Sequence, residues 1–288
     1  EDGSPSSIKS FFSLVEEWKA VDKYTVKLTL SSPDADMPYK LTQPQAKIVK
    51  KNTHNWWQAG TGPYVLDSFQ AGVRSIHSRN NNYWRDTGQW LDNIEITAIT
   101  DMNARLNALL SGSVDMITAI SAKQIKKIES SGLNVLSVPA GVYGGICCLK
   151  NTAPGDNDDL VQGLRDIQDR ERIVRKFLKG HGTLGNDHPI NISYGADHCH
   201  ELPQIPYDPE KAKWHLNKSG YTEAEIWVAP VTGAIEDVCL LMQANLKKIG
   251  FNLKLKKVPS DGYWGAVWMK EPLNVVSWNK RPTANSMM

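Results

Sequence analysis

The segment that most constrains the fold is a long helix pattern lying between two short strand patterns. Its apolar residues recur at helical spacing from Ala234 to Ile249, and Gly250 ends the pattern after about four turns. Residues 226–228 before it form a short apolar run, and residues 251–256 after it alternate apolar and polar. A strand, a helix and a strand in this order are typical of a β–α–β unit, whose two strands run parallel. The sequence therefore predicts an α/β fold with a largely parallel sheet.

Strand and helix patterns also alternate through the remainder of the chain. Short alternating or β-branched runs predict strands or extended segments at residues 24–30, 64–69, 74–78, 94–99, 114–117, 133–138 and 275–278. Apolar residues at helical spacing predict helices at residues 102–110, 121–128, 159–179 and 209–219. The last helix has clear ends, because Asp208 is a favoured N-cap, Pro209 suits the first turn and Gly220 is a favoured stop.

Composition and charge exclude several classes of protein. The 288 residues fit one large or two ordinary domains, and 33 basic against 31 acidic residues leave a net charge of +2. A near-neutral chain has no overall field to hold nucleic acid or an anionic membrane, so we expect no nucleic-acid partner. No apolar run reaches the roughly 18 residues of a membrane-spanning segment. The polar residues 1–7 contain no signal peptide, which leaves the compartment open.

The sequence carries no catalytic signature. It lacks a nucleophile elbow, a phosphate-binding loop, a dinucleotide fingerprint and a zinc-protease motif. The four cysteines form no C-x-x-C pair, and we expect buried free thiols. His198 and His200 would share one side of an extended segment, although no second ligand pair lies at a familiar spacing. We therefore expect no enzyme and no cofactor, and keep a metal-dependent hydrolase using these histidines as an alternative.

Tryptophan is frequent, with ten Trp against five Phe. Aromatic residues gather near the end of the sequence beside polar and basic ones: Tyr263, Trp264, Trp268, Trp278, Asn279, Lys280 and Arg281. Trp264 and Trp268 are four residues apart, which fits core packing on a helix as well as ligand binding. Trp278 ends a predicted strand, and open α/β sheets bind ligands at such strand ends. An indole face beside the guanidinium of Arg281 suits a small polar or acidic solute.

Short motifs in a fixed order resemble a known family. Residues 60–64 (Gly-Thr-Gly-Pro-Tyr) and 79–84 (Arg-Asn-Asn-Asn-Tyr-Trp) resemble a signature of the family 5 extracellular solute-binding proteins. These are the dipeptide- and oligopeptide-binding components of bacterial ABC importers. Further motifs of this family follow in the same order, at residues 101–115, 151–154, 169–170, 207–221 and 243–250. The similarity runs over almost the whole chain, which resembles the middle portion of longer family members.

The resemblance implies an α/β, periplasmic-binding-protein-like fold of type II, with two lobes and incomplete at both ends. Lobe I, with a remnant of the family's extra domain, would span residues 1–141, and lobe II residues 142–288. The lobes would close around a solute without chemistry and deliver it to a membrane ABC permease. We expect a monomer in the periplasm, or a lipid-anchored protein outside a Gram-positive cell.

Two positions depart from the family pattern. Between Val161 and Asp169 the chain is one residue shorter, with Gln162 where the family often has Arg, and one lost residue rotates a helix by about 100°. Many peptide-binding members carry an Asp shortly after the tryptophan that matches Trp278, and Arg281 stands at that position here. Because a cation repels a peptide's ammonium group, we expect an opine-like conjugate, an acidic sugar derivative or a peptide bound differently.

The same resemblance assigns candidate ligand-binding residues. Tyr143 and Trp278 would face the cleft and Arg281 would recognise charge, with Trp264, Trp268 and Asn279 as further candidates. A binding module for metal chelates or haem is the alternative within this fold, because the wider family includes such proteins.

Overall fold

The computed structural model describes residues 12–44, 46–48, 60–138 and 140–287, so the polar stretch 1–7 lies outside the described residues. The chain forms two compact units: the first comprises Glu1–Arg105 with Arg281–Ser286, and the second comprises Leu106–Lys280. Helix α2 (Met102–Leu110) carries the chain out of the first unit, and the link from Lys280 to Arg281 brings it back.

Antiparallel strands build the first unit. Strands β1 (Val15–Ala20) and β2 (Val26–Leu30) pair as a hairpin, and helix α1 (Met37–Lys40) follows. Strands β3 (Tyr64–Gln70), β4 (Arg74–Arg79) and β5 (Asn93–Thr97) form a three-stranded sheet in sequence order. Gly72 in the turn from β3 to β4 has φ 71°, a conformation that glycine adopts without strain. The predicted hairpin of residues 64–69 and 74–78 is confirmed.

The returning segment 281–286 is fixed to the first unit by side-chain hydrogen bonds. Thr283 Oγ1 donates to Asp36 Oδ2 over 2.8 Å, and Asn285 Nδ2 donates to the same oxygen over 3.2 Å. Thr283 and Ser286 also bond to each other, which closes a tight turn. Asp36, directly before α1, therefore anchors the end of the described chain.

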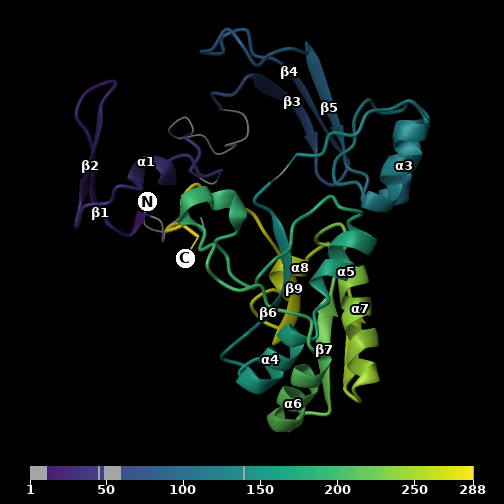
Figure 1. Ribbon diagram of the computed structural model, residues 1–288. Coiled ribbons are helices and arrows are strands. Elements are labelled where there is room, and N and C mark those ends of the chain that lie inside the picture. Colours follow the sequence, from purple (N-terminus) through teal and green to yellow (C-terminus); the bar gives the residue numbers. More distant parts are fainter. Residues whose placement is uncertain (1–11, 45, 49–59, 139, 288) are drawn as a thin grey trace. The chain divides into compact units, whose positions relative to one another are not determined.

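A four-stranded sheet in the order β6–β9–β7–β8 forms the centre of the second unit. Its strands are β6 (Tyr143–Cys148), β7 (Glu223–Val228), β8 (Asn252–Lys257) and β9 (Leu273–Trp278). Strand β7 runs parallel to both neighbours, and β6 runs antiparallel to β9. Helix α7 (Ile235–Lys248) connects β7 to β8, so the predicted β–α–β unit is confirmed. Figure 1 shows α7 beside β7 in this unit.

This topology gives the sheet one distinct edge. The carboxyl ends of β7, β8 and β9 and the amino end of β6 share it, because β6 alone is reversed. We call it the carboxyl edge, and define it by the strand residues Val228, Lys257, Trp278 and Tyr143. Open α/β sheets bind ligands at an edge of this kind.

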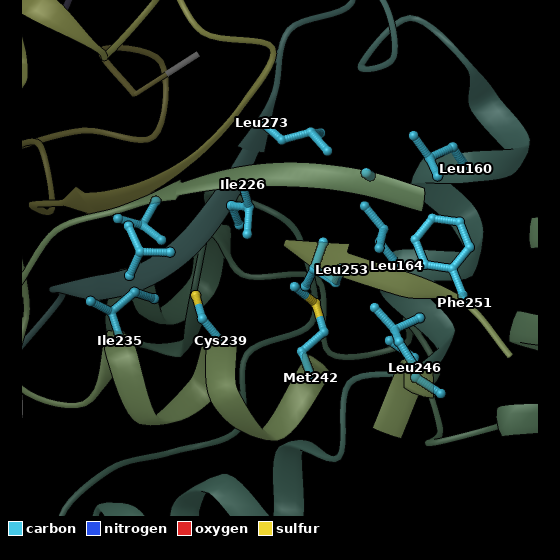
Figure 2. Packing of buried hydrophobic residues seen from close by; sticks show 14 of the residues in the cluster. Leu160, Leu164, Ile226, Ile235, Cys239, Met242, Leu246, Phe251, Leu253 and Leu273 are labelled. Atoms are coloured by element: carbon cyan, nitrogen blue, oxygen red, sulfur yellow. The ribbon is translucent and has the colours of Figure 1, made fainter. Parts of the chain in front are cut away.

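Three helices bury apolar side chains against this sheet: α4 (Asp158–Asp166), α6 (Pro209–Ser219) and α7. Figure 2 shows side chains of α7, among them Met242 and Leu246, directed towards Ile226 of β7 and Leu253 of β8. Leu246 is 0% exposed. Full burial of one such side chain contributes about 1.5–3 kcal/mol, so this cluster forms the core on which the carboxyl edge is built.

Helix ends follow their sequence signals closely. The carboxylate of Asp208 accepts a hydrogen bond from the backbone N–H of Lys211 over 2.9 Å, Pro209 begins α6, and Gly220 ends it with φ 79°. Helix α3 (Ala122–Ser130) begins with a capping box formed by Ser121 and Gln124. Within the described ranges, no helix combines the length and the apolar character that crossing a membrane requires.

The predicted strand at residues 114–117 is wrong, and residues 133–138, which we expected to be extended, belong to no strand. The backbone N–H of Val114 bonds back to Ala108 in α2, and that of Leu133 bonds back to Ile128 in α3. These N–H groups bond to carbonyls at the ends of helices, so they are not available to pair with a strand. Met116 and Leu136 are strongly exposed, so the apolar runs also bury little surface.

The predicted continuous helix at residues 159–179 is also wrong. Helix α4 ends at Asp166, and α5 (Arg170–Arg172) begins after Asp169, whose carboxylate accepts from the N–H of Arg172 over 3.0 Å. A π-helical turn, η3 (Ile173–Phe177), follows. Asp169 caps a new helix instead of continuing the old one, as short acidic side chains often do. The break falls in the segment where the sequence departs from the family pattern.

Candidate functional site

Two predicted site residues meet at the carboxyl edge. Tyr143 of β6 and Trp278 of β9 are directly opposite each other in the antiparallel register. Directly opposite side chains lie on the same face of a sheet, with Cβ atoms roughly 5 Å apart. Both are half-buried. Burial raises the pKa of the Tyr143 phenol, and the nearby Tyr194 adds to this, so the hydroxyl keeps its proton at neutral pH.

Three tryptophans, which we call the tryptophan row, extend from this pair. The ring centroids of Trp278 and Trp268 lie 6.0 Å apart, and those of Trp268 and Trp264 also lie 6.0 Å apart, with interplanar angles of 74° and 75°. Edge-to-face contacts of this kind stabilise aromatic pairs by about 0.5–1.5 kcal/mol. The row forms a connected aromatic surface that ends at Trp264, which is 47% exposed.

A buried tyrosine fixes this row to the core. Helix α8 (Tyr263–Ala266) begins with Tyr263, which is 1% exposed and whose hydroxyl donates to the Val275 carbonyl of β9 over 2.8 Å. Its ring contacts Trp264 edge to face at 5.5 Å. Burial raises the pKa of Tyr263 to about 12. Tyr263 is therefore a structural residue, and it positions the tryptophans.

Trp268 carries an unusual polar group. Its indole Nε1 is buried and has no hydrogen-bond partner in the described part of the chain. Buried indole N–H groups normally have a partner. Trp268 is thus neither an ordinary core residue nor an open surface residue.

A cation–aromatic contact that the sequence does not mark lies at the same edge. The short 3₁₀ segment η4 (Ile192–Asp197) is capped by Asn191, which also donates to the carbonyl of Gly141 over 3.4 Å. Lys280 Nζ donates to the Ser193 carbonyl over 2.5 Å and lies 4.8 Å from the ring centroid of Tyr194. The only sequence signal was the position of Lys280 two residues after Trp278, because nothing local marks Tyr194 as its neighbour.

The remaining predicted site residues belong to different parts of the chain. Asn279 is exposed and follows Trp278 in the second unit. Arg281 is half-buried and begins the segment that belongs to the first unit. The structure therefore brings Tyr143, Trp264, Trp268, Trp278 and Asn279 together in one unit, and the role of Arg281 stays a prediction.

The histidine segment forms an aromatic contact cluster. The rings of His188 and His198 stack with centroids 5.1 Å apart, and His200 meets His198 edge to face at 4.7 Å. The Ile190 carbonyl lies 2.7 Å from His198 Nδ1, which must donate to it because a carbonyl only accepts. Among the described residues, no group of three or more His, Cys, Asp or Glu side chains is placed to hold a metal ion.

The cysteines are free thiols in graded environments. Cys239 is buried as predicted, Cys147 and Cys148 are half-buried, and the expectation of burial is wrong for Cys199, which is exposed on the histidine segment. Burial raises the pKa of Cys239 to about 12 and that of Cys148 to about 11. Both stay protonated at neutral pH, and a protonated thiol is a poor nucleophile.

Comparison with known proteins gives a consistent family relationship. The model of the bacterial extracellular solute-binding proteins, family 5 Middle, matches residues 1–287. Heme-binding protein A of Haemophilus influenzae is 27% identical over 269 residues, which cover 83% of this chain and 47% of that protein. The dipeptide-binding protein of Pseudomonas aeruginosa is 26% identical over 255 residues, covering 82% and 48%. The chain thus spans about half the length of the curated relatives it matches.

Solved structures share the fold of this chain. The AgaA structure from A. tumefaciens in complex with agropinic acid is 23% identical with a TM-score of 0.79, and the match covers 96% of this chain and 59% of that one. DppA from Helicobacter pylori in complex with the peptide STSA is 18% identical with a TM-score of 0.79, and the match covers 96% and 58%. The predicted α/β, periplasmic-binding-protein-like fold of type II is confirmed.

Proposed function

Because this chain belongs to the family 5 bacterial extracellular solute-binding proteins, we propose that it captures a small solute for import by a membrane ABC permease. Its relatives are named as binding proteins for dipeptides, glutathione and haem. A role in binding rather than catalysis also agrees with a sequence that has no catalytic signature. We propose that the protein acts outside the cytoplasmic membrane, either in the periplasm or anchored by a lipid. We also propose that it is a monomer.

The observation that carries this proposal is the aromatic carboxyl edge. Tyr143 lies opposite Trp278, and the tryptophan row continues from there to the exposed Trp264. Aromatic faces hold flat or sugar-like solutes by desolvating them, while phenol and indole groups supply orienting hydrogen bonds. We propose that this surface of the second unit contacts the solute.

The proposed solute carries an acidic group. Arg281 stands where many peptide-binding members have an Asp, and a guanidinium binds a carboxylate in a forked geometry. Agropinic acid, an acidic compound, is bound by the related AgaA. We propose an opine-like conjugate or acidic sugar derivative, or a peptide bound differently. The lobe boundary between residues 141 and 142 and closure of the lobes around the solute belong to the same proposal.

Native mass spectrometry of the purified chain tests this function directly, because a retained solute adds a defined mass. Titration calorimetry with agropinic acid, the dipeptide Met-Leu and glutathione then compares solute classes. Trp278→Ala should abolish binding, whereas Trp214→Ala, which removes an exposed tryptophan of α6, should not. Arg281→Ala should weaken acidic solutes selectively. Equal binding by wild type and Trp278→Ala would refute the assigned site, and no binding of any solute would refute the function.

A further inference from the structure

We propose that Lys280 binds the carboxylate of the solute at the carboxyl edge, beside the Tyr143–Trp278 pair. This inference deepens the proposed function and rests on it. It assigns the charge recognition within the second unit to a residue that the family pattern does not mark. It also makes the acidic solute class a property of the second unit's own residues, separate from Arg281.

The ammonium group of Lys280 is held in place. It donates to the Ser193 carbonyl over 2.5 Å and lies 4.8 Å from the ring centroid of Tyr194, which is 8% exposed. A lysine side chain otherwise loses about 2 kcal/mol of rotamer freedom when a ligand fixes it. Because the carbonyl and the ring already restrict the side chain in the free protein, less rotamer freedom is lost when the solute binds. Preorganisation of this kind raises affinity.

The charge of Lys280 is also not neutralised. Among the described residues, no Asp or Glu carboxylate lies within ion-pair distance of its Nζ, although most of the other ion pairs of the second unit join a lysine to a carboxylate. An ammonium has three N–H donors, and the Ser193 carbonyl takes one of them. Two donors are left for a carboxylate.

The position of Lys280 places this cation beside the aromatic surface. Lys280 follows the last residue of β9 by two positions, and Tyr143 lies opposite that last residue. The segment η4, to which Lys280 is hydrogen-bonded, lies at the same edge. Its cap Asn191 donates a hydrogen bond to the carbonyl of Gly141, two residues before β6. Cation, phenol and indole therefore belong to one edge of one sheet, which suits a solute with a flat or sugar-like body and an acidic group.

A purely structural role for Lys280 gives a different expectation. If the lysine only fastens η4 to the end of β9, its loss would loosen the edge and weaken every solute alike. If it binds the carboxylate, its loss would weaken only solutes that carry one. The two roles are separated by a pair of probes that differ in that single group.

The experiment measures affinity for agropinic acid and for its carboxamide by titration calorimetry on the full chain. Lys280→Gln should weaken agropinic acid about ten- to a hundredfold, the range expected for a charge-assisted hydrogen bond, and leave the carboxamide within about twofold. Lys280→Arg should keep most of the affinity. Lys218→Gln is the matched control, because Lys218 also lies over an aromatic ring, that of Trp214. Lys218 is near the end of α6, just before the amino end of β7, and so does not belong to the carboxyl edge.

Three outcomes overturn the inference. Equal weakening of both probes in Lys280→Gln would show a structural fastening, and no weakening would show that Lys280 is not at the site. Equal affinity of the wild type for acid and carboxamide would show that the site does not recognise charge. In each of these cases the proposed solute-binding function stands, whereas failure of the wild type to bind any solute overturns both.

Discussion

Replacing Tyr263 by Phe tests whether one buried hydroxyl fastens the tryptophan row to the sheet. Tyr263 is 1% exposed, and its hydroxyl donates to the Val275 carbonyl of β9 over 2.8 Å. The Phe variant keeps the ring, and with it the edge-to-face contact with Trp264 at 5.5 Å. The change therefore removes a hydrogen bond and little else.

The expected size of the effect follows from burial. A hydrogen bond contributes about 1 kcal/mol net, but removing one partner leaves the other unsatisfied, which costs about 1–3 kcal/mol when the site is buried. Val275 is 0% exposed, so water has little access to its carbonyl. We therefore expect Tyr263→Phe to lower the free energy of unfolding by about 1–3 kcal/mol.

Urea denaturation followed by circular dichroism measures this change. Tyr207→Phe is the control, because Tyr207 is 39% exposed and its loss should change stability by no more than about 0.5 kcal/mol. Alkaline pH gives a second measurement. The pKa of Tyr263 is raised to about 12 in the folded chain, so its contribution is complete below the unfolded value near 10 and is lost as the pH rises through 12. A variant as stable as the wild type, with the same alkaline limb, would refute the role given to this hydroxyl.

Three further predictions concern the core, a charge pair and a helix end. Leu246→Ala, at a fully buried position of α7, should lower the free energy of unfolding by about 2–5 kcal/mol, and an unchanged urea midpoint would contradict the assigned core. Hydrogen bonds from His215 and then Lys218 lower the pKa of Asp159, so its contribution is present above the unfolded value and is lost as the pH falls through the folded one. Asp159→Asn should reduce the loss of stability at acid pH, and an unchanged loss would mean that the hydrogen bonds of Asp159 do not stabilise the fold. Gly220→Ala should cost about 1 kcal/mol in thermal denaturation, because the residue has φ 79°, and no loss would mean that the C-cap relaxes freely.

Elements with signals inside their own sequence could be predicted. Helix α6 is an example, because Asp208, Pro209 and Gly220 mark both of its ends within thirteen residues. The β–α–β unit was predictable for a related reason: α7 is long enough for its period to be clear, and its two flanking strands are short, the first with an apolar run at residues 226–228 and the second with alternating apolar and polar residues. In each case the information that determines the structure is local.

Elements that depend on distant partners could not be predicted in full. Residues 114–117 have a strand-like composition but no strand to pair with, and Val114 completes the end of α2 instead. The break after α4 arises because Asp169 caps a new helix. Composition alone does not determine whether such an Asp caps a helix or continues one. A strand is defined by its neighbour, so its pattern alone is a weaker predictor than that of a helix.

The candidate site divides in the same way. Trp278 was predicted as a strand-end residue, but its position opposite Tyr143, more than a hundred residues earlier, depends on the antiparallel register of β6 and β9. The contact of Lys280 with Ser193 and Tyr194 also joins distant segments. Residue type indicated what these side chains could bind, whereas the topology of the sheet decided which of them are neighbours.

The tryptophan row also gives the protein an optical property. Two indoles with centroids 6.0 Å apart at an angle of 74° are close enough for their electronic transitions to couple, and such coupling makes near-ultraviolet circular dichroism sensitive to geometry. Exposed and isolated tryptophans such as Trp90 contribute little to that signal. A solute that lies against Trp278 would shift the row and change the spectrum, so the chain carries its own unlabelled reporter of occupancy.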